Sequence, residues 1–190
     1  MCSSDLFPSH DTNRDNNFRT GAAVTTTQSI TYNFQKNTTA PKFQIEVEAY
    51  KGFTHVGMCA DMYLFTSLNT KEHIGSRLRG IRDNQYFADS TGKSSSYACS
   101  TRSALVVNLD LPIHLFTTNF TKNKLMSKLN FEAQISPFID FAFLYNEATK
   151  TSFYFKDGFY AAGLEGIICP AKWRSLQIRG SIGVDIGRIS

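Results

Sequence analysis

The sequence lacks the residue patterns that mark common enzymes and metal proteins. Its four cysteines have no CxxC spacing, so neither a metal site nor a disulfide framework is predicted. Its four histidines include no ligand-spaced pair. A nucleophile elbow, an HExxH motif and a phosphate-binding loop are also missing. We therefore expect no catalytic residue, no cofactor and no metal, and we predict that the protein is not an enzyme.

Strong charge and long apolar runs are missing too. Charged residues make up 19% of the chain, and the net charge of +4 is too mild to argue for a nucleic-acid partner. The N-terminus has no basic start followed by an apolar core, so it does not predict a signal peptide. No run of about 18 apolar residues is present, which argues against a transmembrane helix. A transmembrane barrel stays open, because its strands are apolar only at alternate positions.

The sequence does have apolar residues at every second position. Residues 1–24 are polar and are predicted to be a loop or a disordered lead-in. Beyond them the alternation predicts β-strands rather than helices, because apolar residues recur at i and i+2. We expect an all-β, antiparallel up-and-down meander of about seven strands. Pro137 interrupts the longest run, and a bulge or bend is expected there.

The predicted strands have one apolar face and one face with charges at mid-strand. These charged residues are Glu46, Glu48, Asp61, Asp110, Glu132, Asp140, Glu165, Arg179 and Asp185. In a soluble sandwich or small barrel, the apolar face would be the core and could bind a small apolar ligand. In a membrane barrel, the apolar face would meet lipid and the charges would line a wet lumen. The long strands and the aromatic residues near their ends favour the membrane alternative.

One connection, residues 67–102, is far longer than a usual hairpin loop of about 2–5 residues. It carries Arg79-Gly80 near its middle and lies between two predicted strands. Such a loop is either flexible, with an exposed arginine, or it directs a basic side chain to a specific partner. The loop alone does not decide between these interpretations.

Four motifs, in this order, resemble the C-terminal barrel region of the BamA-type bacterial surface antigen family. They are Arg79-Gly80-Ile81, residues 108–111, residues 137–142, and a closing hairpin made of residues 160–166, residues 169–170 and the last strand through Gly187. In that family the first motif lies in a long extracellular loop, and the others lie on the strands that follow. Ile81 stands where the family usually has Phe or Tyr, and Ala142 stands where Gly is usual. The resemblance covers about residues 25–188.

The resemblance implies that residues 25–190 form the C-terminal part of a transmembrane β-barrel in the bacterial outer membrane. It implies a function in the insertion or translocation of proteins, with nascent outer-membrane proteins and accessory assembly proteins as partners. The long loop would fold back into the lumen and place Arg79 against Asp110 and Asp140. Gly80 would allow close backbone approach there. The contact would lock the loop, so that Arg79→Ala lowers stability and Arg82→Ala does not.

Closure of such a barrel needs more strands than about seven, because unpaired backbone groups in lipid cost several kcal/mol each. Three explanations are open: a fragment of a longer product, one part of a split or decayed gene, or an oligomer that closes between chains. The first two are favoured. The expected partners therefore include the lipid bilayer and either a missing N-terminal barrel half or a second copy.

Overall fold

The computed structural model describes residues 18, 20–35, 37–81, 84–88, 94–98, 100–118, 130–146, 151–155, 158–170 and 176–186. Strands account for most of these residues, and the short helix η1 (Gly75–Arg77) has only three. Within these ranges, no helix has the length and apolar character needed to cross a membrane.

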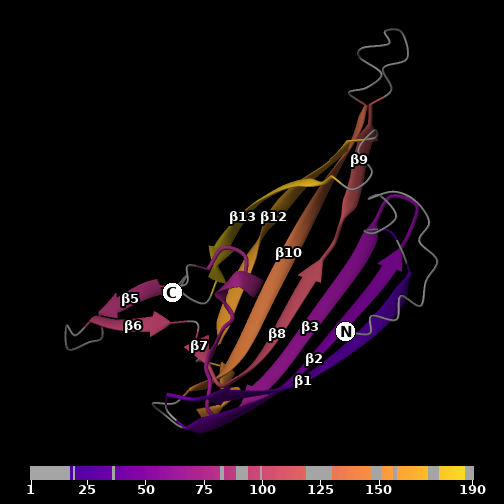
Figure 1. The fold of residues 1–190 in the computed structure, drawn as a ribbon. Coiled ribbons are helices and arrows are strands. Elements are labelled where there is room, and N and C mark those ends of the chain that lie inside the picture. The colour runs from indigo at the N-terminus through magenta and orange to yellow at the C-terminus, as the bar shows by residue number, and fades with distance from the viewer. Residues whose placement is uncertain are drawn as a thin grey trace.

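One curved antiparallel sheet makes up most of the structure (Figure 1). Its main strands, in spatial order, are β1 (Gly21–Asn33), β2 (Thr38–Gly52), β3 (Gly57–Ser67), β8 (Ser103–Asp110), β10 (Phe131–Asn146), β12 (Phe159–Pro170) and β13 (Ile178–Asp185). The short strands β9 (Ile113–Thr117) and β11 (Thr151–Ser152) also pair with β10. The spatial order follows the sequence order, which confirms the predicted all-β, up-and-down architecture.

The connection between β3 and β8 has structure of its own. It contains β4 (Glu72–His73), η1, β5 (Asn84–Ala88), β6 (Ser94–Ala98) and β7 (Ser100–Thr101). Strand β4 pairs with β7, and β5 pairs with β6, so two small sheets form within the connection. Its first part folds back over one face of the main sheet, where η1 lies (Figure 1). We call this the covered face, and the opposite side the open face.

The first strand begins earlier than the sequence suggested. Strand β1 starts at Gly21, so residues 21–24 of the predicted lead-in belong to the sheet. They pair with residues near the C-terminal end of β2. Gly21 lies opposite Tyr50, and Val24 lies opposite Val47. A long partner strand extends β1 because each added pair satisfies more backbone groups. Residues 1–17 and 19 lie outside the described residues.

A bulge or bend was expected at Pro137, and the register shows no bulge there. Strand β10 pairs with β12 without interruption, and Pro137 lies opposite Leu164. On the other side, the carbonyl of Pro137 accepts a hydrogen bond from the Leu111 amide, and the ladder divides into β8 and β9 around Pro112. The register shift lies further on, between Ala133 and Gln134. Proline is tolerated at position 137 because Pro112 already interrupts the neighbouring strand there.

The mid-strand carboxylates lie on the covered face, which also carries buried apolar side chains, and the open face carries mainly apolar side chains. In β10 the even-numbered residues from 132 to 144 are all buried, whereas Pro137 and Ile139 are exposed. The buried set includes Glu132, Gln134, Ser136 and Asp140, the last with 0% exposure. The open face carries exposed large apolar residues on adjacent strands, among them Met62, Leu109, Ile139, Leu164 and Ile182. An ordinary soluble sheet instead keeps its charged side chains on the solvated face and its large apolar side chains on the buried face.

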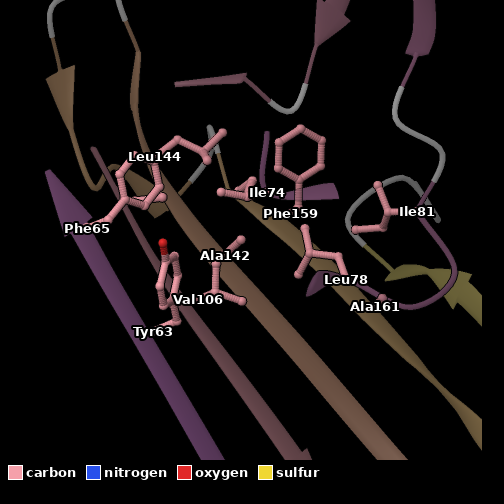
Figure 2. Close-up of a cluster of buried hydrophobic side chains, with 11 residues drawn as sticks. Tyr63, Phe65, Ile74, Leu78, Ile81, Val106, Ala142, Leu144, Phe159 and Ala161 are labelled. Carbon is pink, nitrogen blue, oxygen red and sulfur yellow. The ribbon is translucent and has the colours of Figure 1, made fainter. Parts of the chain in front are cut away.

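A compact apolar cluster holds the connection against the covered face (Figure 2). Figure 2 shows Ile74, Leu78 and Ile81 of the connection facing side chains of the strands. The strand residues are Tyr63, Phe65, Ala104, Val106, Ala142, Leu144, Phe159 and Ala161. Full burial of an Ile or Leu side chain stabilises by about 1.5–3 kcal/mol relative to exposure. The cluster lies at the end of the sheet where the connection leaves β3 and enters β8.

Candidate functional site

Arg79 lies between two carboxylates of the covered face. Its Nη1 is 2.5 Å from Asp110 Oδ1, and its Nη2 is 2.6 Å from Asp140 Oδ1. The Arg79 Nε and backbone amide both donate to Asp140 Oδ2, at 3.1 and 2.8 Å. The guanidinium carbon also lies 3.9 Å from the centre of the Phe138 ring. One side chain therefore joins β8 and β10 to the connection by charge-assisted hydrogen bonds and a cation–π contact.

The strand register explains why these groups meet. Asp110 lies opposite Phe138, and Asp140 lies opposite Asn108, so all four share the covered face of β8 and β10. The Asn108 side-chain amide donates to the carbonyl of Arg77 at 2.8 Å, which fixes the backbone just before Arg79. The connection therefore cannot slide along the strands without breaking several contacts together.

The electrostatics of Arg79 favour its charged form. Burial opposes the charge, but hydrogen bonds to Asp140 and Asp110 outweigh burial and raise the pKa of the guanidinium above its usual range. Glu165 of β12 adds a more distant carboxylate, 3.8 Å from Nη1. Arg179 lies on the far side of Glu165, with its Nε 3.6 Å from Oε1.

Gly80 brings the backbone of the connection against the last strand of the sheet. Its φ of +81° is in the region that favours glycine. A Cβ placed on Gly80 would lie 2.6 Å from the carbonyl carbon of Gly183 in β13. A Cβ on Gly163 of β12 would lie 2.6 Å from Phe138 Cζ and 2.7 Å from the Gly183 Cα. Three glycines thus make room for Phe138 and for the turn that carries Arg79.

A second polar group fastens the connection to β2 and β3, and the sequence analysis did not identify it. Arg77 Nη1 donates to Glu46 Oε1 at 2.8 Å, and its guanidinium carbon lies 3.5 Å from the centre of the Tyr63 ring. Tyr63 donates to Glu72 Oε1 at 2.9 Å, and Glu72 also forms an ion pair with Lys42. The connection is therefore held on both sides: at β2 and β3 by this group, and at β8, β10 and β13 by Arg79 and Gly80.

We predict that Tyr63→Phe lowers the free energy of unfolding by about 1–2 kcal/mol, because it removes a hydroxyl from a buried hydrogen-bond group. The Tyr63 ring is 2% exposed, and its hydroxyl accepts from Gln44 at 2.6 Å as well as donating to Glu72. The measurement is denaturant unfolding of the whole chain. Tyr32→Phe is the control, because Tyr32 is 45% exposed. Equal midpoints for the two variants would show that the Tyr63 hydroxyl is not structural.

The described residues contain no group of three His, Cys, Asp or Glu side chains that could hold a metal ion. Cys59 and Cys169 are free thiols. Cys2 and Cys99 lie outside the part of the chain that is described. The absence of a catalytic residue and of a cofactor stays a prediction.

Comparisons with protein-family models, with curated proteins and with solved structures found no match to this chain. The resemblance to the BamA-type surface antigen family therefore rests on the sequence motifs alone.

Proposed function

We propose that this chain is the C-terminal part of a β-barrel of the bacterial outer membrane. In this proposal it belongs with the BamA-type surface antigen family and takes part in the insertion or translocation of proteins, without enzyme activity. The observation that carries the proposal is the inverted distribution of side chains: carboxylates on the covered face, and large apolar side chains on the open face.

Rows of apolar residues across the sheet support a lipid-facing surface. The register places Val24, Val47, Met62, Val107 and Phe141 in line across five strands, all on the open face. Contiguous apolar surface of this kind is unusual in soluble monomers and is typical of membrane or protein contacts. On the covered face, the neighbouring row contains Glu48, Asp61, Asn108 and Asp140.

Strand length and aromatic side chains also fit a membrane. Strands β2 and β10 have 15 and 16 residues, more than the roughly 9–11 needed to span a bilayer. Aromatic rings gather at the end of the sheet near the connection, where Phe143, Phe155 and Tyr160 contact one another. Aromatic side chains are enriched at both interfaces of membrane barrels.

Partners follow from the open edges of the sheet. Among the described residues, β1 pairs only with β2, and β13 pairs only with β12. In lipid such edges are costly, so further strands must cover them. We propose that a missing N-terminal barrel half covers them, as expected for a fragment or for one part of a split gene. Self-association is the other source of strands.

The first test is flotation of the full chain with lipid vesicles on a density gradient. We expect the chain to float, and Ile139→Arg to reduce the floating fraction strongly. A positive charge on the lipid face costs about 2–4 kcal/mol near the middle of a bilayer. Ile139 is 42% exposed and lies in the middle of β10. In water the same change at an exposed site would have little effect.

Thr27→Arg is the matched control, because it adds the same charge to the covered side of the sheet. Thr27 lies opposite Gln44, whose side chain bonds to Tyr63 on that side. Thr27→Arg should float like the unchanged chain. A chain that stays folded and soluble without detergent would instead support the alternative, a soluble barrel or sandwich with an apolar ligand.

Function in protein insertion needs a separate measurement. Vesicles that contain the chain are mixed with an unfolded outer-membrane protein, and the fraction that becomes protease-resistant is followed over time. We expect faster assembly than in empty vesicles, and slower assembly again with Arg79→Ala. Equal rates with and without the chain would reject an unaided insertion function while leaving the membrane location intact.

A further inference from the structure

Aromatic side chains lie on the open face near both ends of β10. At the end of the sheet opposite the connection, the ring centres of Phe116 and Phe131 are 6.1 Å apart (Figure 1). At the other end, the Phe155 ring lies 6.2 Å from Phe143 and 4.8 Å from Tyr160. Phe116 is 51% exposed, and Phe155 is 69% exposed. We call these two groups the aromatic rims.

Between the rims the open face is uncharged. In β10 it carries Ala133, Ile135, Pro137, Ile139 and Phe141. The other main strands continue this band across the sheet. Among their described residues on the open face, Lys51 alone is charged, and it lies one residue from the end of β2. A lysine at that place can extend its ammonium group toward water while its alkyl stem lies along the apolar surface.

The separation of the rims matches the thickness of a bilayer. Phe131 and Phe143 are twelve residues apart in β10. That is about 40 Å along an extended strand. Barrel strands tilt by about 35–45° from the membrane normal, so this separation corresponds to about 30 Å across the membrane. The hydrocarbon core of a typical bilayer is also about 30 Å thick.

We propose that the open face fits a bilayer of this thickness, with Phe116 and Phe131 in one headgroup region and Phe143, Phe155 and Tyr160 in the other. The inference rests on the proposed membrane location and adds the depth of each strand residue. Aromatic side chains favour the headgroup regions of membrane barrels, where the apolar band ends. A partner protein fits this face less well, because protein interfaces have a polar rim with many hydrogen bonds.

Tryptophan fluorescence in vesicles with brominated lipids measures depth, because bromine quenches only nearby indole rings. Trp173 is the one tryptophan of the chain, so Trp173→Phe provides the background. Single tryptophans are then placed with Phe131→Trp, Ile139→Trp and Phe143→Trp. Ile139 lies four residues inside the rim at Phe143, which is about 10 Å deeper in the bilayer.

We expect lipids with bromine near the headgroups to quench the two rim variants about twofold or more strongly than Ile139→Trp, because of this difference in depth. Lipids with bromine deep in the acyl chains should give the reverse order. Thr27→Trp is the control on the covered side, since Thr27 lies opposite Gln44, and both lipids should quench it weakly.

The outcomes separate this inference from the membrane proposal. Equal quenching profiles for the three open-face variants, in a chain that floats with vesicles, overturn the depth assignment and leave the membrane location intact. So does deeper quenching at Phe131 or Phe143 than at Ile139. Open-face quenching no stronger than that of Thr27→Trp, in a floating chain, means that a protein or a second copy covers the face, and the inference fails. A chain that neither floats nor is quenched loses both proposals.

Discussion

Arg79→Ala lowers the free energy of unfolding by about 3–5 kcal/mol, because it leaves a buried carboxylate without its partner. Asp140 is 0% exposed and receives three hydrogen bonds from Arg79, one from the backbone and two from the guanidinium. The substitution keeps only the backbone bond. It also removes the contact with the Phe138 ring. Breaking one side of a buried pair costs more than the pair itself contributes, since the remaining charge stays desolvated.

Denaturant unfolding in the medium that keeps the chain folded measures this loss. The double variant Arg79→Ala, Asp140→Asn should recover part of it, because the second change removes the unpaired charge. Arg179→Ala should cost at most about 1 kcal/mol, since the Arg179 side chain is 49% exposed and its contact with Glu165 is long. Arg82 lies outside the described residues, and Arg82→Ala is predicted to leave stability unchanged. Equal losses for Arg79→Ala and Arg82→Ala would contradict a lock at Arg79.

The strands were predictable because side-chain alternation has a period of two. Residues 131–145 alternate clearly, and β10 follows them closely. The start of β1 was missed because residues 21–24 are Gly-Ala-Ala-Val, which show no alternation, and glycine and alanine are unfavourable in strands. Only the long-range pairing with β2 reveals that the strand extends back to Gly21.

The apolar cluster on the covered face was missed as well. The alternation predicted charges at mid-strand on this face, but it did not predict that Tyr63, Phe65, Val106 and Leu144 pack together there beside Asp61 and Asp140. A signal was present in residues 141–145, which are apolar at every position. Such a continuous run indicates that both faces of a strand meet apolar surroundings.

The candidate site was partly accessible from the sequence. Strand parity placed Asp110 and Asp140 on one face, and the family resemblance directed Arg79 toward them; the structure brings all three together. The group around Tyr63 and Glu72 left no such signal. Tyr63 is nine residues from Glu72 in the sequence, and Gln44 is 28 residues from Glu72. These contacts depend on how the connection folds back, and no local spacing encodes that path.

Gly80→Ala should cost about 2–3 kcal/mol, because a side chain at positive φ is strained and this one also meets backbone. The new Cβ would lie 2.6 Å from the carbonyl carbon of Gly183, a group that cannot rotate away. The turn would have to lift from β13, and it would carry Arg79 with it. The expected result is therefore a loss of stability together with a loosened connection.

Trypsin measures that loosening directly, because it cleaves after arginine. In the unchanged chain, Arg77 and Arg79 are half-buried and held by carboxylates, so cleavage there should be slow. Gly80→Ala should speed cleavage after Arg79 at a denaturant concentration where the sheet stays folded. Gly180→Ala is the matched control, since a Cβ on Gly180 meets nothing within 4 Å. Equal cleavage rates in the two variants would show that the approach of Gly80 to Gly183 does not hold the connection in place.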